Sequence, residues 1–220
     1  MVAGAGTKGT NVKLYKLTDS QDRTMAWCQW GPGIQHRTSG EGEMCTSAWT
    51  HWCTDPLLAV MLNPIHGNYD LETAHLWEGE GTVGATDHGL KIGCADGVTI
   101  RRVRLPRVTG AQRVRFGILC ALTVCRSEKF KAWAKKAWPL KRSGVARAKS
   151  VAEAEAMRAG ATTTEAWAVL AVVRAEEGAV RTAAQAAAEA AAAAAKQAAR
   201  RAVPINLAAL AKRAVEEGRA

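Results

Sequence analysis

The chain has 220 residues, of which 48% are hydrophobic and 23% charged, and it carries a formal net charge of +10. These proportions are those of globular proteins and exclude a wholly disordered chain. No apolar run is long enough to predict a membrane span, and residues 1–10 lack the apolar core of a secretory signal. We therefore expect a cytoplasmic protein without a membrane partner.

Short strands are expected in the first 108 residues. Apolar and polar side chains alternate over 12–17, which predicts a strand. Three further strands are expected at 25–30, 75–80 and 98–105. Asp55 is a natural N-cap and Pro56 a natural first helical residue, so a short helix is expected over 57–62.

Two helices are expected to follow. Thr109 can cap the first, and Ser127 can cap the second, which Pro139 ends. Trp133 and Trp138 lie on an apolar stripe at helical spacing along the second helix. The stripe indicates packing against the sheet, and stacking on nucleic-acid bases is the alternative.

Alanine dominates the last third of the chain. A helix is expected over 145–159, and a longer one, capped by Thr164, over 165–202 with Gly178 as its weak point. A short final helix is expected over 207–217. Because alanine side chains bury little area, we interpret this region as an arm that pairs with a second copy of the chain. A solvated helix without a partner is the alternative.

The predicted fold class is α+β: a small, mostly antiparallel sheet with covering helices, followed by a long alanine-rich helical arm. We expect residues 1–142 to form an α+β ligand-binding domain. Residues 143–220 are expected to form the arm, which ends in a docking helix and makes the protein a homo-oligomer.

The positive charge is concentrated in one segment. Residues 101–149 contain 15 Lys and Arg against one Glu, whereas residues 1–100 contain 6 Lys and Arg against 11 Asp and Glu. Such a basic segment can bind nucleic acid, an anionic small molecule or the acidic first half of the same chain.

The six cysteines lie within the first 125 residues, and we expect them to be free thiols. The spacing of Cys45, His51 and Cys53 matches no zinc motif, so neither a metal nor another cofactor is predicted. A thiol–histidine pair could be drawn from many combinations of Cys and His in this region, and the sequence singles out none of them.

Several segments resemble an uncharacterised domain family of phage and prophage genomes, over about the first 140 residues. The segments that carry the resemblance are 14–19, 29–33, 39–45, 54–60, 62–66, 76–78 and 112–120. The resemblance implies a phage protein in the host cytoplasm and brings no activity with it.

Residues 49–60 also resemble the second NAD-contacting segment of ADP-ribosyltransferase folds, in which an aromatic strand leads into a helix. This resemblance implies a nucleotide-sized pocket. The chain lacks that family's first-strand His or Arg and its late-strand catalytic Glu, so the resemblance assigns no catalytic residues.

The sequence favours a non-enzymatic binder of an anionic, nucleotide-like molecule, and the resemblance to the phage family implies a host defence signal as that molecule. Tryptophan offers flat stacking surfaces, and arginine pairs well with phosphate. The expected ligand-binding residues are Tyr15, Lys16, Trp30, His51, Trp52, Arg101, Arg102 and Arg104. A nucleic-acid-binding accessory protein that uses residues 101–149, and an ADP-ribosyltransferase-like enzyme, are the alternatives.

Overall fold

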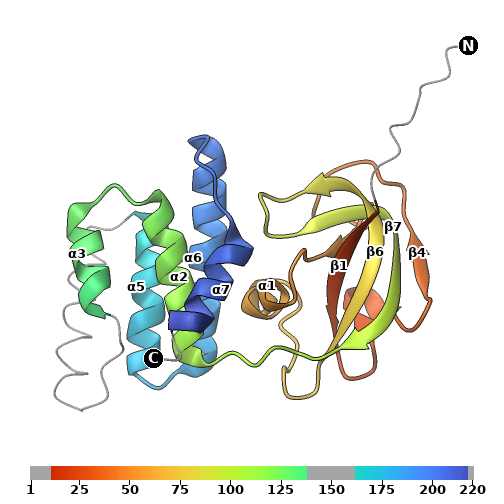
Figure 1. Ribbon diagram of the computed structural model, residues 1–220, viewed down its shortest axis with the longest axis horizontal. Helices are drawn as coiled ribbons and strands as arrows, with labels where there is room; N and C mark the ends of the chain where they lie inside the picture. The colour runs from red at the N-terminus through yellow and green to blue at the C-terminus, as the bar shows by residue number, and fades with distance from the viewer. Residues whose placement is uncertain (1–10, 138–161, 218–220) are drawn as a thin grey trace, which may run out of the picture. The chain divides into compact units, whose positions relative to one another are not determined.

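The computed structural model describes residues 11–137 and 162–217. Contacts divide the chain into two units (Figure 1). The sheet unit contains residues up to 56 together with 70–87 and 91–105, and the helical unit contains 57–69, 88–90 and the residues from 106 onward. Antiparallel strands and helices occur together, which confirms the α+β class.

The sheet is built on two long neighbouring strands, β6 (His75–Thr86) and β7 (Ile92–Val103). On one side β6 pairs with β1 (Asn11–Thr18), and on the other side β7 pairs with β4 (Gln35–Arg37) and β5 (Thr50–Trp52), always antiparallel. Two backbone hydrogen bonds of 2.8 Å join Tyr15 to Cys53, just after β5. The sheet therefore closes on itself.

Glycines let the sheet curl tightly around Trp52. A Cβ atom at Gly79 would lie 2.3 Å from the Val98 carbonyl oxygen and 2.7 Å from the Trp52 ring. A Cβ atom at Gly97 would also lie 2.7 Å from that ring. The register between β6 and β7 shifts after Glu78, which bends the strands further. Trp52 is 1% exposed at the centre of the closed sheet.

Three of the four strand predictions are confirmed, with different bounds. β1 matches the strand expected at 12–17, whereas β6 runs on to Thr86 and β7 already begins at Ile92. The strand expected at 25–30 is wrong. There a short 3-10 helix, η1 (Met25–Trp27), separates β2 (Arg23–Thr24) from β3 (Cys28–Gln29), because Trp27 has a φ of +61°.

Six α-helices lie in the described part of the chain: α1 (Pro56–Met61), α2 (Gly110–Val124), α3 (Glu128–Ala137), α5 (Thr163–Glu176), α6 (Val180–Arg200) and α7 (Leu207–Glu217). Thr109 caps α2 through a reciprocal pair of hydrogen bonds with Gln112, and Ser127 accepts from the Phe130 amide at the start of α3. These helix starts and the bounds of α7 confirm the sequence predictions. The short 3-10 helix η2 (Asn63–Ile65) follows α1.

The single helix expected over 165–202 is two helices. Thr162, not Thr164, caps α5, and it forms a capping box with Glu165. Gly178 then adopts a φ of +80° between α5 and α6, a conformation that glycine reaches without strain. The helix expected over 145–159 and the end expected at Pro139 lie outside the described residues.

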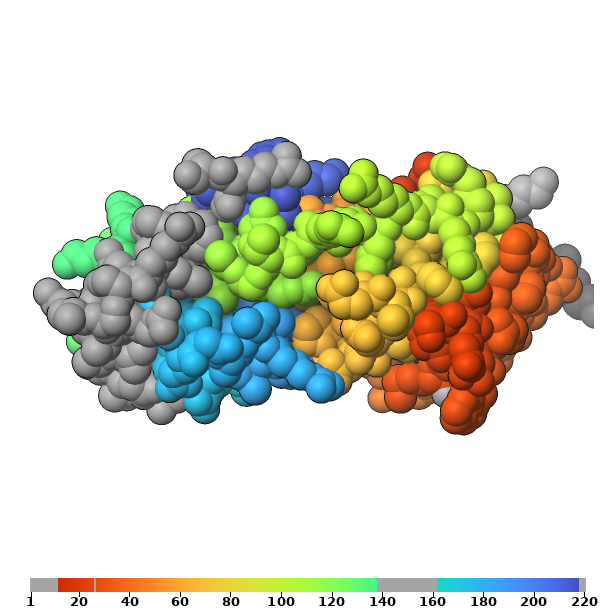
Figure 2. Space-filling view, turned by 90° about the horizontal axis from the view of Figure 1, so that it is seen from below, coloured from red at the N-terminus to blue at the C-terminus, as the bar shows by residue number. Residues whose placement is uncertain are grey.

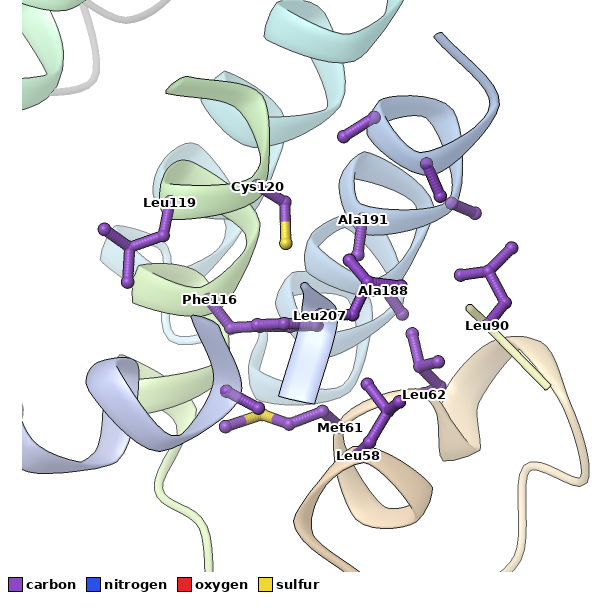
Figure 3. Close-up of a cluster of buried hydrophobic side chains, with 14 of the residues drawn as sticks. Leu58, Met61, Leu62, Leu90, Phe116, Leu119, Cys120, Ala188, Ala191 and Leu207 are labelled. Atoms are coloured by element: carbon purple, nitrogen blue, oxygen red, sulfur yellow. The ribbon is translucent and has the colours of Figure 1, made fainter. Parts of the chain in front are cut away.

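The alanine-rich helix α6 is the centre of the helical unit. Ten of its alanines are buried, and they pack against α2, α5 and α7. This helix is therefore not the separate arm that the sequence predicted, because other helices of the same chain already cover its alanine face. Figure 3 shows Ala188 and Ala191 facing side chains of α1 and α2. The expectation of a homo-oligomer stays a prediction, without the alanine face to support it.

Helices α2 and α6 run parallel and very close together. Figure 2 shows the green start of α2 against the blue start of α6. Gly110 lies beside Val180 at these starts, and Gly117 lies beside Ala187 seven residues further along. A Cβ atom at Gly117 would be 3.0 Å from the Ala187 Cα atom. The small residues at this crossing let the two backbones approach.

The domain boundary expected at residue 142 differs from the boundary between the two units that the contacts define. Helices α2 and α3 share their core with α5 and α6, so they belong with the C-terminal helices in one unit. Composition suggested the wrong boundary because it separated alanine-rich from alanine-poor helices. None of the described helices is both long enough and apolar enough to cross a membrane.

We predict that Ala187→Leu lowers the free energy of unfolding of the helical unit by about 1–3 kcal/mol. Ala187 is 1% exposed and contacts Gly117 at backbone distance, so the larger side chain has no space. Ala199→Leu, at an exposed position of α6, is the matched control. Urea unfolding followed by circular dichroism measures both, and equal stability of the two variants would contradict the close helix crossing.

Candidate functional site

The predicted ligand-binding residues all lie in the sheet unit, but they form two separate groups. Lys16, Trp30 and Trp52 meet inside the closed sheet, where they are 6%, 2% and 1% exposed. Arg101, Arg102 and Arg104 are exposed, on β7 and just after it. The structure thus brings the tryptophans to a lysine rather than to the arginines.

The Lys16 ammonium is enclosed by aromatic rings. Its Nζ atom lies 4.2 Å from the centroid of the Trp30 ring and 4.4 Å from that of the Trp52 ring, both within cation–π range. The same atom donates a 2.5 Å hydrogen bond to the His51 carbonyl oxygen. The two indoles meet edge to face, with centroids 5.3 Å apart. These contacts make a packed interior. The Lys16 ammonium occupies the position between the tryptophan rings where a ligand was expected.

Burial lowers the pKa of Lys16 to about 8, because removing the ammonium from water disfavours its charged form. Interactions with Cys28, Cys53 and Cys94 oppose this shift. The group is therefore mostly protonated at neutral pH and loses its charge in mildly alkaline solution.

Tyr15 and His51 contribute their backbones to this interior. Side chains alternate along a strand, so Tyr15 points to the opposite face of β1 from Lys16, while its peptide groups close the sheet. The His51 ring hydrogen-bonds the Met44 carbonyl oxygen through Nε2, at 2.5 Å. Partial burial lowers the pKa of His51, so its ring is neutral at pH 7.

Carboxylates of the first half of the chain pair with two of the three arginines. Arg101 binds Glu78 through Nε and a terminal nitrogen, each at 3.1 Å. Arg102 pairs with Asp22 and lies over the Trp77 ring, 5.4 Å from its centroid. Such internal pairing was one of the roles expected for the basic segment.

Asp22 is the centre of a cluster of polar contacts, the Asp22 hub, which was not predicted from the sequence. Its Oδ1 atom accepts from His75 Nδ1 at 2.8 Å and from Trp77 Nε1 at 2.9 Å, and its Oδ2 atom accepts from Arg102. Burial opposes ionisation of Asp22, but these donors outweigh it and lower its pKa. The partners lie 53 to 80 residues away in sequence, so no local spacing could have revealed the cluster.

Helix α3 carries unpaired positive charge on its outer face. Phe130, Trp133, Ala134 and Ala137 are buried against α2, α5 and α6. Lys129, Lys135 and Lys136 are exposed, and none of them has a carboxylate at ion-pair distance among the described residues. Trp133 is 7% exposed, which makes it a packing residue and not a stacking platform. Trp138 lies outside the described residues.

A cavity of about 140 Å³ lies beside the turn between α2 and α3. Arg126 and Arg201 line it together with the Glu165 carboxylate. Within the cavity wall, Cys125 Sγ donates to Glu165 Oε1 at 2.7 Å. Burial, together with this carboxylate, raises the pKa of the Cys125 thiol to about 11.

The structure has six free thiols. Cys45 is exposed, Cys28 and Cys125 are half-buried, and the other three are buried. The described residues contain no group of three or more His, Cys, Asp or Glu side chains that could hold a metal ion.

We predict that raising the pH from 8 to 10 stabilises the protein relative to its Lys16→Met variant. The folded pKa of about 8 lies below the 10.5 of an ordinary lysine, so the unfolded state binds more protons in this window. The free energy of unfolding then rises with pH, by at most about 1.4 kcal/mol per pH unit. Urea unfolding at each pH measures the difference in free energy of unfolding between the wild type and Lys16→Met. Because both proteins have the same cysteines, the contribution of thiol ionisation cancels in this difference.

Lys13→Met is the control for this experiment. Lys13 is exposed on the same strand, and its hydrogen bond to Glu78 raises its pKa, so its contribution to stability falls as the pH rises. A wild-type advantage over Lys16→Met that does not grow between pH 8 and 10 would contradict the buried ammonium.

Comparison with protein-family models, curated proteins and solved structures finds no match to this chain. The resemblances to a phage domain family and to ADP-ribosyltransferases therefore stay predictions.

Proposed function

We propose that the protein binds nucleic acid through a basic face of its helical unit. This α3 face consists of Lys129, Lys135 and Lys136, with Arg126 at the preceding turn. The observation that carries the proposal is the division of α3 into a fully buried apolar side and an outer side whose exposed lysines lack carboxylate partners among the described residues. A helix anchored in this way presents its charges on a rigid support.

The charge of the two units supports the proposal. The described residues of the helical unit include 15 Lys and Arg against 7 Asp and Glu, whereas those of the sheet unit include 8 against 11. Binding of lysines to phosphates releases condensed counterions, which is the main source of sequence-independent affinity for nucleic acid. The acidic sheet unit offers no such gain.

The arrangement of the lysines favours a polymer over a small anionic molecule. Lys129 and Lys136 are seven residues apart on the helix, which corresponds to a rise of about 10 Å. Charges that are spread along a helix match successive phosphates of a backbone, whereas a small ligand needs donors that converge on one point. Arg101 and Arg102, the other candidates, are already paired with Glu78 and Asp22.

We predict that Lys129→Gln/Lys135→Gln/Lys136→Gln weakens the binding of a generic DNA duplex. Fluorescence anisotropy at several salt concentrations gives both the affinity and its salt dependence. Loss of three phosphate contacts should reduce the slope of log affinity against log salt by about 2–3. The lysines are exposed, so the variant should keep the stability of the wild type.

The matched control is Arg37→Gln/Lys91→Gln/Arg104→Gln, which removes the same charge from the sheet unit. It should leave DNA affinity nearly unchanged. Equal losses in the two triple variants, or wild-type affinity without salt dependence, would refute the α3 face as the binding surface. Binding to anionic lipid vesicles but not to DNA or RNA would replace the proposed partner with a membrane surface.

A further inference from the structure

Cys28 and His36 form a thiol–imidazole pair at the surface of the sheet unit. Cys28 lies on β3 and His36 on β4, and the Cys28 Sγ atom is 3.7 Å from Nδ1 and 3.5 Å from Nε2 of the ring. Both residues are half-buried, so each keeps part of its surface in contact with solvent. The sequence offered no reason to choose this cysteine or this histidine from the others.

The backbone carbonyl group of Gln29 orients the imidazole of His36. Nε2 lies 2.7 Å from the Gln29 carbonyl oxygen, which can only accept, so Nε2 carries the proton. Nδ1 is then the unprotonated nitrogen, free to accept the proton of the Cys28 thiol. The Trp30 ring packs on the imidazole with centroids 4.4 Å apart and holds its orientation. Nucleophile, base and orienting group thus stand in the order that activates a thiol.

The Lys16 ammonium lies against Trp30, the same ring that packs on His36. It also interacts electrostatically with Cys28. A nearby positive charge stabilises a thiolate, the reactive form of cysteine. The environment of Cys28 therefore combines a proton acceptor with a buried cation.

The other five cysteines lack this combination. Burial raises the pKa of Cys53 to about 12 and that of Cys94 to about 11, and it also raises the pKa of Cys120. Cys125 donates to a carboxylate, which keeps its thiol protonated. Cys45 is exposed but has no hydrogen-bond partner for its thiol among the described residues.

We propose that Cys28 is a site of thiol modification, activated by His36 and Lys16, that reacts with low-molecular-weight disulfides. His36 Nδ1 takes the proton from Cys28 Sγ, and the thiolate attacks one sulfur of the disulfide. The sulfur–sulfur bond of the reagent breaks, a new one forms to Cys28, and the leaving thiolate takes the proton from the imidazolium. The disulfide is the oxidant, and the products are a mixed disulfide and one free thiol.

The test measures the modification rate at each cysteine of the full-length protein with hydroxyethyl disulfide, a small neutral reagent. Peptide mapping by mass spectrometry after acid quenching gives the rates at Cys28 and Cys45 from the same sample. At pH 7 we expect Cys28 to react at least about tenfold faster, although Cys45 is more exposed. Faster or equal reaction at Cys45 would overturn the proposal.

His36→Asn tests the role of the base. The variant should slow the reaction of Cys28 by about tenfold or more, while the rate at Cys45 stays the same as an internal control. Labelling of buried Cys53 and Cys94 would reveal unfolding of the sheet unit, in which case the ratio of the Cys28 rate to the Cys45 rate in the wild type decides alone. An unchanged Cys28 rate in a folded His36→Asn variant would refute the activation by His36.

Discussion

The close approach of α2 and α6 at Gly117 and Ala187 is the constraint on which the helical unit depends. Alanine buries little area per residue, so a helix made of it gains stability only where neighbouring backbones come near. Here small residues on both helices permit that distance, and α5 and α7 cover the remaining alanine surface. Low side-chain volume is thus the condition for a compact core.

This core also fixes the orientation of α3. Phe130 and Trp133 are buried in one cluster with residues of α2, α5 and α6, which leaves Lys129, Lys135 and Lys136 on the outside. If the proposed function is correct, the α3 face needs no flexible arm to reach a phosphate backbone, because the alanine-rich core supports it. In the sheet unit the positive charge is organised differently: Lys16 is enclosed by two indoles, and Arg101 and Arg102 are paired with carboxylates.

Local signals predicted the local structure well. Thr109, Ser127 and the residues of α7 specified helix starts and ends because capping depends on a few neighbouring residues. Tertiary contacts could not be predicted from neighbouring residues in the same way. The alanine run predicted a helix but not its burial, because its partner in α2 lies about 70 residues earlier. Trp27 ended a predicted strand through a backbone conformation that its side chain does not signal.

Tertiary contacts also limited the prediction of the candidate sites. Lys16, Trp30 and Trp52 were predicted to act together, and they do lie together, although as a packed interior around a cation. The Asp22 hub and the Cys28–His36 pair were not predicted, since sheet register and loop geometry bring their members together. The apolar stripe of α3 followed from helical periodicity, but only the contacts show that Lys129, Lys135 and Lys136 have no ion-pair partner among the described residues.

Hydrogen exchange of the backbone amides of α6 in the full-length protein tests the central claim most directly. If the alanine helix is the core of the helical unit, amides from Ala186 to Ala195 should exchange as slowly as those of α2, through opening of the whole unit. Exchange of these amides within seconds at neutral pH, while α2 stays protected, would show that α6 is a solvated arm and would contradict the account.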